Sequence, residues 1–323
     1  MPNNYFRLVE FTLQAGCPVM CTFCPVELFL KNYRSQIRKF TVNSFKQALL
    51  NLQNSRIRDI AFCGFSEPLY HKNLPDFINL SVEAGFTVEI TSTLKGLNVE
   101  SIKKVKDLPI KWNISLQPFG ISNRKGLKDE EAWNNIKSFL ELDSKFQVIF
   151  ACLDLNLSQE QKTQLNEKGK QIGIKNILYG DFQTRAGNIV HNTINNQRKK
   201  LYCDHMAPVI LPNGDMTLCC QDFGQRHIIG NILKTPFNDI LSSDTLRKIL
   251  NIMQLKEKGS ILCHTCEVAV PLPAFVSPFF CPAIGKIVDN NIINSILPIG
   301  SQRRKKFKPV KDFLKNLMKK FDV

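Results

Sequence analysis

The sequence has no run of 18 or more apolar residues, so it predicts no membrane-spanning helix. Its first ten residues also lack the basic and then apolar build of a signal peptide. Without an export signal, the eleven cysteines are not expected to form the disulfide framework of a secreted protein. We therefore predict a protein of the reducing cytoplasm whose clustered cysteines ligate metal.

Acidic residues are scarce beside basic ones. The 323 residues include 43 Lys or Arg and 28 Asp or Glu, for a formal net charge of +15. Residues 303–323 hold nine basic and two acidic side chains, so +7 of this charge lies in the last 21 residues. The remaining +8 (15 − 7) mildly favours an anionic substrate or surface. The length allows one large α/β domain and a small one.

Three cysteines lie within eight residues, in the stretch Cys17-Pro-Val-Met-Cys21-Thr-Phe-Cys24. Thiolates at this spacing can converge on a soft metal centre, either an iron–sulfur cluster or zinc. Three ligands would leave one iron of a 4Fe–4S cluster open, and an open position is how metal sites admit a substrate. Phe23 could shield one edge of the cluster or stack on a bound aromatic ring. The alternative is a structural zinc site with a fourth ligand from elsewhere.

Apolar runs separated by helical segments predict parallel β/α units. The expected strands are 5–13, 59–63, 86–91, 111–116, 147–153 and 176–179, and the expected helices are 42–55, 74–84, 98–107, 129–142 and 158–173. This series predicts an α/β fold, a partial (β/α)6 TIM-like barrel. In barrels of this kind the site lies at the C-terminal ends of the strands, where the cysteine stretch also falls.

Polar residues follow several of the predicted strands. The loop after the second strand reads Cys63-Gly64-Phe65-Ser66-Glu67-Pro68-Leu69, in which glycine permits close approach of a ligand and Glu67 could accept hydrogen bonds from a cationic amine. The alternative is an ordinary turn with a solvated carboxylate. Further polar strand-end residues, for which turn chemistry is the alternative, are Thr91-Ser92-Thr93, Ser115, Gln117 and Asn156.

A second cysteine set follows a polar linker at residues 191–200. A predicted hairpin at 209–218, a predicted helix at 236–254 and the pair Cys263-x-x-Cys266 could bring four sulfurs to one centre with no open iron. The expected ligands are Cys203, Cys219, Cys263 and Cys266, and a zinc ribbon of the same ligands is the alternative. Cys220 should point away from Cys219 along the strand, and Cys281 is a reserve candidate. Cys63 and Cys152 are expected to be small buried hydrophobes.

The first cysteine stretch, placed after a short N-terminal strand, resembles the signature of the radical S-adenosylmethionine (radical SAM) superfamily. The resemblance implies that Cys17, Cys21 and Cys24 hold a 4Fe–4S cluster whose fourth iron binds SAM. One electron from the cluster then cleaves SAM to methionine and a 5′-deoxyadenosyl radical. An electron donor such as flavodoxin or ferredoxin is implied as a partner.

The same resemblance extends to the strand-end loops. Gly64, Glu67 and Pro68 match the Gly-Gly-Glu-Pro segment that holds the SAM amino group, with Phe65-Ser66 in place of the second glycine. Thr91-Ser92-Thr93 is a poor match to the Thr-Asn-Gly-like turn of the family. The resemblance implies that SAM is bound by residues at these places, which are Phe23, Gly64, Ser66, Glu67, Pro68, Ser115, Gln117 and Asn156.

The second cysteine set resembles the SPASM (twitch-like) domain of some radical SAM enzymes. The matching features are Cys203 before the hairpin, Gly214 five positions before Cys219, the doubled Cys219-Cys220, Gly230-Asn231-Ile232, Cys263-x-x-Cys266 and the upstream Arg185-Ala186-Gly187-Asn188. The resemblance implies one auxiliary 4Fe–4S cluster. We predict a radical SAM core at 1–190, a SPASM-type domain at 191–270, a Pro-rich apolar segment at 271–300 and a basic tail at 301–323.

The tail has apolar residues on one helical face with lysines around it, which is typical of an amphipathic helix on an anionic membrane surface. We therefore expect a cytoplasmic protein that contacts the inner membrane face peripherally. A solvated or disordered tail is the alternative.

The resemblance predicts an enzyme that abstracts a hydrogen atom from a substrate carbon. Its auxiliary cluster would accept an electron, which makes the net reaction an oxidation, or ligate the substrate. The expected substrate is a small molecule, sugar or lipid-linked group, and Asp181, Gln183 and Arg185 are candidate substrate contacts. A ribosomally made peptide, modified by crosslinking, thioether formation or epimerisation, is the alternative. A start directly at strand one counts modestly against it, because such maturases often begin with a leader-binding domain.

A non-catalytic protein with two zinc sites and a nucleic-acid-binding tail is the rival of another class. The β/α series and the Glu67 loop would have no role in it, so no nucleic-acid partner is expected.

Overall fold

The computed structural model describes residues 6–21, 23–116, 128–152, 157–180, 184–189, 200–203 and 206–271. They belong to one compact unit, Met1–Pro273, and a second unit, Ala274–Val323, lies outside the described residues. The predicted Pro-rich segment and basic tail, including Cys281, therefore also lie outside them. Within the described part of the chain, no helix is long and apolar enough to cross a bilayer.

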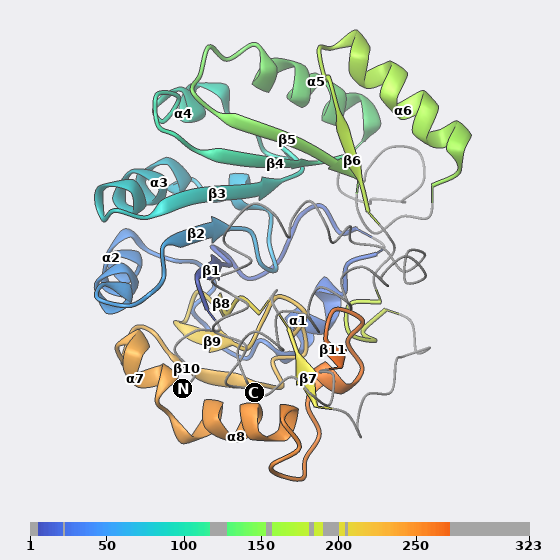
Figure 1. Cartoon of the computed structure of the whole chain (residues 1–323). Coiled ribbons are helices and arrows are strands. Elements are labelled where there is room, and N and C mark those ends of the chain that lie inside the picture. The colour runs from blue at the N-terminus through green and yellow to red at the C-terminus, as the bar shows by residue number, and fades with distance from the viewer. Residues whose placement is uncertain are drawn as a thin grey trace, which may run out of the picture. The chain divides into compact units, whose positions relative to one another are not determined.

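A nine-stranded sheet runs through this unit in the order β10-β9-β8-β1-β2-β3-β4-β5-β6 (Figure 1). All pairs from β8 through β1 to β6 are parallel, whereas β8, β9 and β10 pair antiparallel. The strands are β1 Leu8–Phe11, β2 Asp59–Phe62, β3 Thr87–Ser92, β4 Lys111–Ser115, β5 Gln147–Cys152, β6 Ile177–Tyr179, β8 Val209–Ile210, β9 Asp215–Thr217 and β10 Ile228–Asn231. A separate antiparallel pair joins β7 Leu201–Tyr202 to β11 Val270–Pro271.

Half of the eight α-helices in the described residues begin with a side-chain cap. Thr41 and Ser158 form capping boxes with Ser44 and Gln161, and Asn98 accepts a hydrogen bond from Ser101 N. The α-helices are α1 Val26–Asn32, α2 Val42–Leu52, α3 Leu74–Glu83, α4 Val99–Lys103, α5 Asp129–Leu140, α6 Gln159–Gln171, α7 Phe237–Leu241 and α8 Asp244–Met253. Two short 3-10 helices are η2 Pro68–Tyr70 and η3 Leu262–His264.

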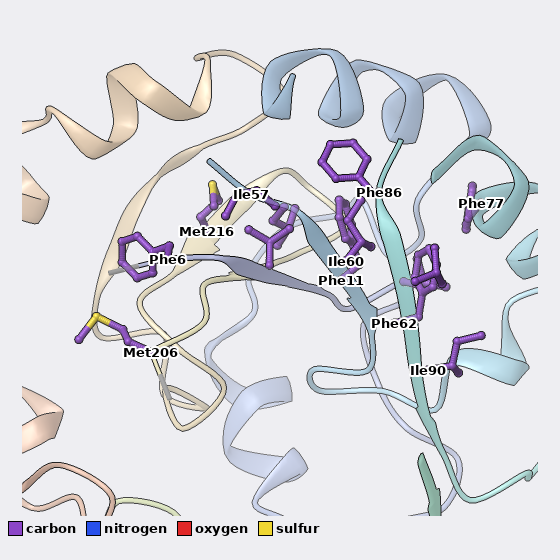
Figure 2. Close-up of a cluster of buried hydrophobic side chains, with 14 of the residues drawn as sticks. Phe6, Phe11, Ile57, Ile60, Phe62, Phe77, Phe86, Ile90, Met206 and Met216 are labelled. Atoms are coloured by element: carbon purple, nitrogen blue, oxygen red, sulfur yellow. The ribbon is translucent and has the colours of Figure 1, made fainter. Parts of the chain in front are cut away.

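One hydrophobic core fills the space between the sheet and the helices α2 to α8. Figure 2 shows its centre, where Phe11 of β1 lies beside Ile60 and Phe62 of β2. Phe45 of α2 packs at this centre against Phe11 and Phe77, with ring centroids 4.9 and 4.5 Å away. Burial of these large side chains holds the helices against one face of the sheet.

The opposite, inner face of the sheet is more polar. On β1, Val9 and Phe11 are buried in the core, while Leu8 and Glu10 alternate with them and are half-buried. Successive side chains of a strand point to opposite faces, so Glu10 faces inward. The register aligns Glu10 with Ala61 of β2, and aligns Ala61 with Glu89 of β3.

The structure confirms the α/β fold with a partial parallel barrel and corrects details of it. The helix expected at 236–254 is two helices, because Ser243 caps α8 after α7 has ended. The prediction missed α1 altogether. It also expected the 209–218 hairpin to stand in a separate domain, but β8 pairs in parallel with β1 and extends the core sheet. The boundary at residue 190 stays a prediction.

Replacing Phe45 by alanine should lower the free energy of unfolding by about 3–5 kcal/mol, because a buried ring is removed and a cavity remains. Urea unfolding followed by circular dichroism measures the change. The matched control is Leu50→Ala on the same helix, where the side chain is 58% exposed and the cost should stay within about 0.5 kcal/mol. Equal losses in both variants would contradict the assigned core.

Candidate functional site

The loop that carries Cys17, Cys21 and Cys24 leaves the C-terminal end of β1 and ends at α1. All three cysteines are half-buried, and Cys24 N donates a hydrogen bond to Cys21 O at 3.0 Å. Met20 has a φ of 49°, a left-handed conformation that is uncommon for a residue other than glycine. The loop therefore turns tightly just before the second cysteine and again between the second and third. Phe23 is buried, with 8% of its side chain exposed.

The three cysteines pack against different parts of the fold. Cys17 and Cys21 pack against Val19 and Ala132, the second of which belongs to α5. Cys24 packs against a second apolar cluster that includes Phe29 of α1 and Phe65 of the loop after β2. The cysteine loop is thus supported by α5, by α1 and by the loop after β2.

The loop after β2 comes close to β1 because Gly64 has no side chain. Gly64 has a φ of 65°, and a Cβ atom there would lie 2.2 Å from Thr12 Oγ1. The next residue, Phe65, donates its backbone N–H to Thr12 Oγ1 at 2.9 Å. Its ring lies 4.9 Å from Phe29 and 4.6 Å from Phe223. Phe65, which replaces the second glycine of the related motif, therefore joins this loop to α1 and to the segment after β9.

Glu67 is buried, and its carboxylate accepts four hydrogen bonds from the protein. Oε1 accepts from Ser92 Oγ at 2.6 Å and from Leu69 N at 3.3 Å. Oε2 accepts from Thr93 Oγ1 at 2.7 Å and from Thr93 N at 2.8 Å. Burial raises the pKa of Glu67, and these hydrogen bonds act against the rise. The reading of Glu67 as a solvated turn residue is therefore wrong.

Ser92 and Thr93 are site residues that the motif match underrated. They follow the position where the sequence predicts the third strand to end, and their hydroxyl groups hold the Glu67 carboxylate. Their signal in the sequence is a pair of hydroxyl residues at a strand's C-terminal end.

Cys17 adjoins the Glu67 loop. Burial, together with the negative charge of Glu67, raises the pKa of Cys17 to about 12, while the backbone N–H groups of Val19 and Glu67 lower it. The thiol therefore lies next to the predicted SAM-binding loop, as a shared site requires. Bound iron supplies the positive charge that favours a thiolate in such surroundings.

The remaining predicted SAM contacts lie at strand ends or outside the described residues. Ser66 is half-buried, Pro68 begins η2, and Ser115 ends β4. Gln117, Asn156, Asp181 and Gln183 lie outside the described residues.

The four cysteines of the second set, Cys203, Cys219, Cys263 and Cys266, lie in the same region of the fold. Cys263 and Cys266 are buried with 4% exposure each, and Cys203 and Cys219 pack against the same core. Burial raises the pKa of Cys219 most, and Cys220, Cys263 and Cys266 raise it further. Burial and the neighbouring Cys266 and Cys203 likewise raise the pKa of Cys263. These mutual effects place all four thiols around one region, a donor set that fits an iron–sulfur cluster.

Among the described residues, no three His, Cys, Asp or Glu side chains form a group spaced for a single metal ion. No disulfide joins any of the ten cysteines in the part of the chain that the structure describes.

Cys220 turns away from this set, as predicted. It packs against the apolar cluster of Phe65 and Phe223, and its thiol lies close enough to Glu10 to lower the pKa of that carboxyl group. Cys63, at the end of β2, also lowers the pKa of Glu10, and it is half-buried, so the expectation of a buried hydrophobe holds for Cys152 but not for Cys63. Glu10 itself was not predicted.

Solved structures share this fold. SuiB from Streptococcus suis, bound to precursor peptide SuiA, has a TM-score of 0.60 at 14% identity, over 82% of this chain and 70% of SuiB. The anSMEcpe structure with AdoMet and the Cp18Cys peptide has a TM-score of 0.58 at 11% identity, over 90% and 99% of the two chains. BtrN in complex with AdoMet and 2-DOIA has a TM-score of 0.51 at 17% identity, over 84% and 95%.

Sequence comparisons identify the chemistry. The SPASM family, an iron–sulfur cluster-binding domain, matches residues 203–267, which contain all four cysteines of the second set. The chain is 21% identical over 273 residues to the S-adenosyl-L-methionine-dependent 2-deoxy-scyllo-inosamine dehydrogenase of Niallia circulans, covering 82% of this chain and 94% of that one. Together, these matches support a radical SAM enzyme with a SPASM domain. A radical SAM enzyme of this type uses SAM, a 4Fe–4S cluster that binds SAM, and an auxiliary iron–sulfur cluster.

Cys219→Ala should remove the auxiliary cluster and lower the iron content from about eight to about four per chain, since each 4Fe–4S cluster holds four irons. Iron analysis after anaerobic reconstitution measures this. Cys220→Ala is the matched control, because its side chain lies on the other face, and it should keep the full iron content. Equal iron losses would show that the two side chains are wrongly assigned.

Proposed function

We propose that this radical SAM enzyme is a dehydrogenase that oxidises a hydroxyl-bearing carbon of a small molecule, sugar or lipid-linked group. The observation that carries the proposal is that the neighbouring residues Cys219 and Cys220 have side chains in different surroundings. One side chain joins the auxiliary thiol set and the next reaches Glu10 on the inner face of the barrel. The auxiliary cluster on Cys219 would therefore lie close to the inner face of the barrel. From there it could accept an electron from a substrate held on that face. The similarity to a SAM-dependent dehydrogenase over 94% of its length supports the same reading.

We assign the ligands of the SAM-binding cluster as Cys17, Cys21 and Cys24, and those of the auxiliary cluster as Cys203, Cys219, Cys263 and Cys266. When bound, the cluster and SAM supply a radical that removes a hydrogen atom from carbon. Gly64 lets the backbone approach SAM, and Glu67 accepts a hydrogen bond from its cationic amine. The Leu69 N–H contact to Glu67 Oε1, at 3.3 Å, is the longest of the four and would give way to the amine.

The other proposed SAM contacts are Phe23, Ser66, Pro68, Ser115, Gln117 and Asn156. A small reductase partner such as flavodoxin or ferredoxin delivers the electron. The auxiliary cluster accepts the substrate's electron in this proposal, and direct ligation of the substrate is the alternative. The domain boundaries at residues 190 and 270 belong to the same proposal.

A peptide substrate is the second candidate. The fold likeness to SuiB with its precursor peptide and to anSMEcpe with a peptide favours it. In that case the product is a crosslink, a thioether or an epimerised residue.

Anaerobically reconstituted enzyme, given reductant and 2-deoxy-scyllo-inosamine deuterated at its carbinol carbons, should form 5′-deoxyadenosine that carries deuterium, together with a ketone. Mass spectrometry measures both products. The control is the triple variant Cys17→Ala, Cys21→Ala, Cys24→Ala, which should form neither.

Deuterium-free 5′-deoxyadenosine with no ketone, from this probe and from a panel of polyols and sugar alcohols, would contradict the dehydrogenase. Deuterium transfer from a labelled peptide would then support the second candidate.

We also propose that the basic tail, residues 301–323, binds an anionic membrane surface. Each basic residue near such a surface contributes about 1 kcal/mol, and the apolar residues that the sequence predicts on one helical face would add to it. Full-length protein should sediment with phosphatidylserine vesicles at low salt, whereas a chain that ends at Gly300 should not. Equal sedimentation of the two chains would contradict a membrane role for the tail.

A further inference from the structure

The carboxyl group of Glu10 lies on the inner face of the barrel, near Cys63 and Cys220. Glu10 is on β1, which is flanked by β2 and by β8. Its backbone N–H donates to Pro208 O at 2.9 Å, so the SPASM segment holds this strand directly. The side chain therefore occupies a fixed place where the barrel core meets the SPASM domain.

Two thiols and one cation meet this carboxyl group from distant parts of the chain. The thiols of Cys63 at the end of β2 and of Cys220 after β9 lie close enough to this carboxyl group to lower its pKa, and the positive charge of Arg185 lowers it as well. A thiol is a weak hydrogen-bond donor. A substrate hydroxyl can therefore replace either thiol at the carboxylate at little cost.

A strained turn fixes Arg185. Arg185, Ala186 and Gly187 have φ values of 54°, 54° and 78°, and such backbone persists only where the surroundings hold it. Glu267 accepts hydrogen bonds from Thr184 Oγ1 at 2.8 Å and from Arg185 N at 3.2 Å. Thr265, between Cys263 and Cys266, donates to Ala186 O at 3.1 Å. The auxiliary cysteine loop thus positions the cation that faces Glu10.

We propose that Glu10 is a catalytic residue that accepts the proton of the substrate hydroxyl during oxidation, an assignment that rests on the proposed dehydrogenase function. A carbinol carbon becomes a carbonyl by losing one hydrogen atom from carbon, one electron and the hydroxyl proton. The hydrogen atom goes to the SAM-derived radical and the electron to the auxiliary iron–sulfur centre. The O–H bond breaks toward a Glu10 carboxylate oxygen, which becomes protonated, while Arg185 stabilises the negative charge left on the substrate oxygen.

Other carboxylates near the site are already engaged. Glu67 accepts four protein hydrogen bonds. Glu89 on β3 pairs with Lys111 Nζ at 2.9 Å through Oε2 and accepts from Asn113 Nδ2 through Oε1. Burial raises the pKa of Glu10, Cys63 and Cys220 oppose the rise by hydrogen bonding, Arg185 opposes it by its charge, and Glu89 adds to it. A carboxylate with a raised pKa is a stronger base than one in water.

The test compares Glu10→Gln with Glu89→Gln in reconstituted holoenzyme, with 2-deoxy-scyllo-inosamine as the probe. Both changes remove a carboxylate from the inner face while keeping its shape. Glu10→Gln should still form deuterated 5′-deoxyadenosine, yet the ketone formed per 5′-deoxyadenosine should fall about 100-fold or more. Calorimetric binding of the probe without reductant should stay near the wild-type value. Glu89→Gln should keep the wild-type ratio, and Glu10→Asp should recover part of it.

A second readout needs no turnover. The infrared S–H stretch reports hydrogen bonds donated by thiols, so Glu10→Gln should shift two thiol bands, and Cys63→Ser and Cys220→Ser identify them. Adding the probe to the wild type should move the same bands.

Wild-type ketone yield in Glu10→Gln would overturn the assignment, as would thiol bands that the probe leaves unmoved. A wild type that forms 5′-deoxyadenosine without oxidising any hydroxyl would contradict the proposed function instead, and the infrared comparison would still decide whether Glu10 faces a bound polyol.

Discussion

The parallel pairing of β1 with both β2 and β8 is the constraint on which the site depends. Parallel neighbours end at the same edge of a sheet, so the loops that follow them meet there. The cysteine loop follows β1 and the Gly64–Glu67 loop follows β2, whereas Cys219 comes after β9, which runs back antiparallel to β8. One strand inside a sheet of nine thus brings together the residues proposed to hold SAM and the first cluster.

Successive side chains of a strand point to opposite faces, so β1 and β8 present different residues to the helices and to the inner face of the barrel. Phe11 and Ile210 face the helices and build the core, whereas Glu10 and Val209 face inward. Beyond the end of β9, Cys219 packs against the main core, whereas Cys220 packs against the cluster of Phe65 and Phe223. Phe65 packs between Phe29 and Phe223, so an aromatic contact joins the cysteine loop, the SAM loop and the SPASM segment. A loosening of any one of them therefore disturbs the others.

Much of this could be predicted from local sequence. The strands β2 to β6 could be predicted because short apolar or alternating runs are separated by helical segments, and the caps Asn98 and Ser158 mark helix starts as expected. Cysteine spacing identified both thiol sets. The short helix α1 was missed because its seven residues carry little periodic signal and follow Pro25 directly. Two helices were predicted as one because the apolar pattern continues across Ser242 and Ser243.

The rest could not be predicted because it depends on long-range register. A single glutamate in an apolar strand has no signal of function, and the partners of Glu10 become visible only when β8 is placed beside β1. The donors to Glu67 come from the end of β3, which the motif match treated as a poor turn. Hydrogen bonds of this kind can be identified only from the tertiary structure, whereas the two sets of cysteines can be identified from their spacing in the sequence.

The central claim is that the first cysteine loop holds a cluster with one open iron, while the auxiliary cluster is fully ligated by protein. Mössbauer spectroscopy of the 57Fe-reconstituted enzyme, before and after addition of SAM, tests it most directly. The account predicts that SAM changes the signal of about one iron in eight, and that this change disappears when Cys17, Cys21 and Cys24 are replaced by alanine. A spectrum that SAM leaves unchanged, or a change that survives loss of these three thiols, would contradict it.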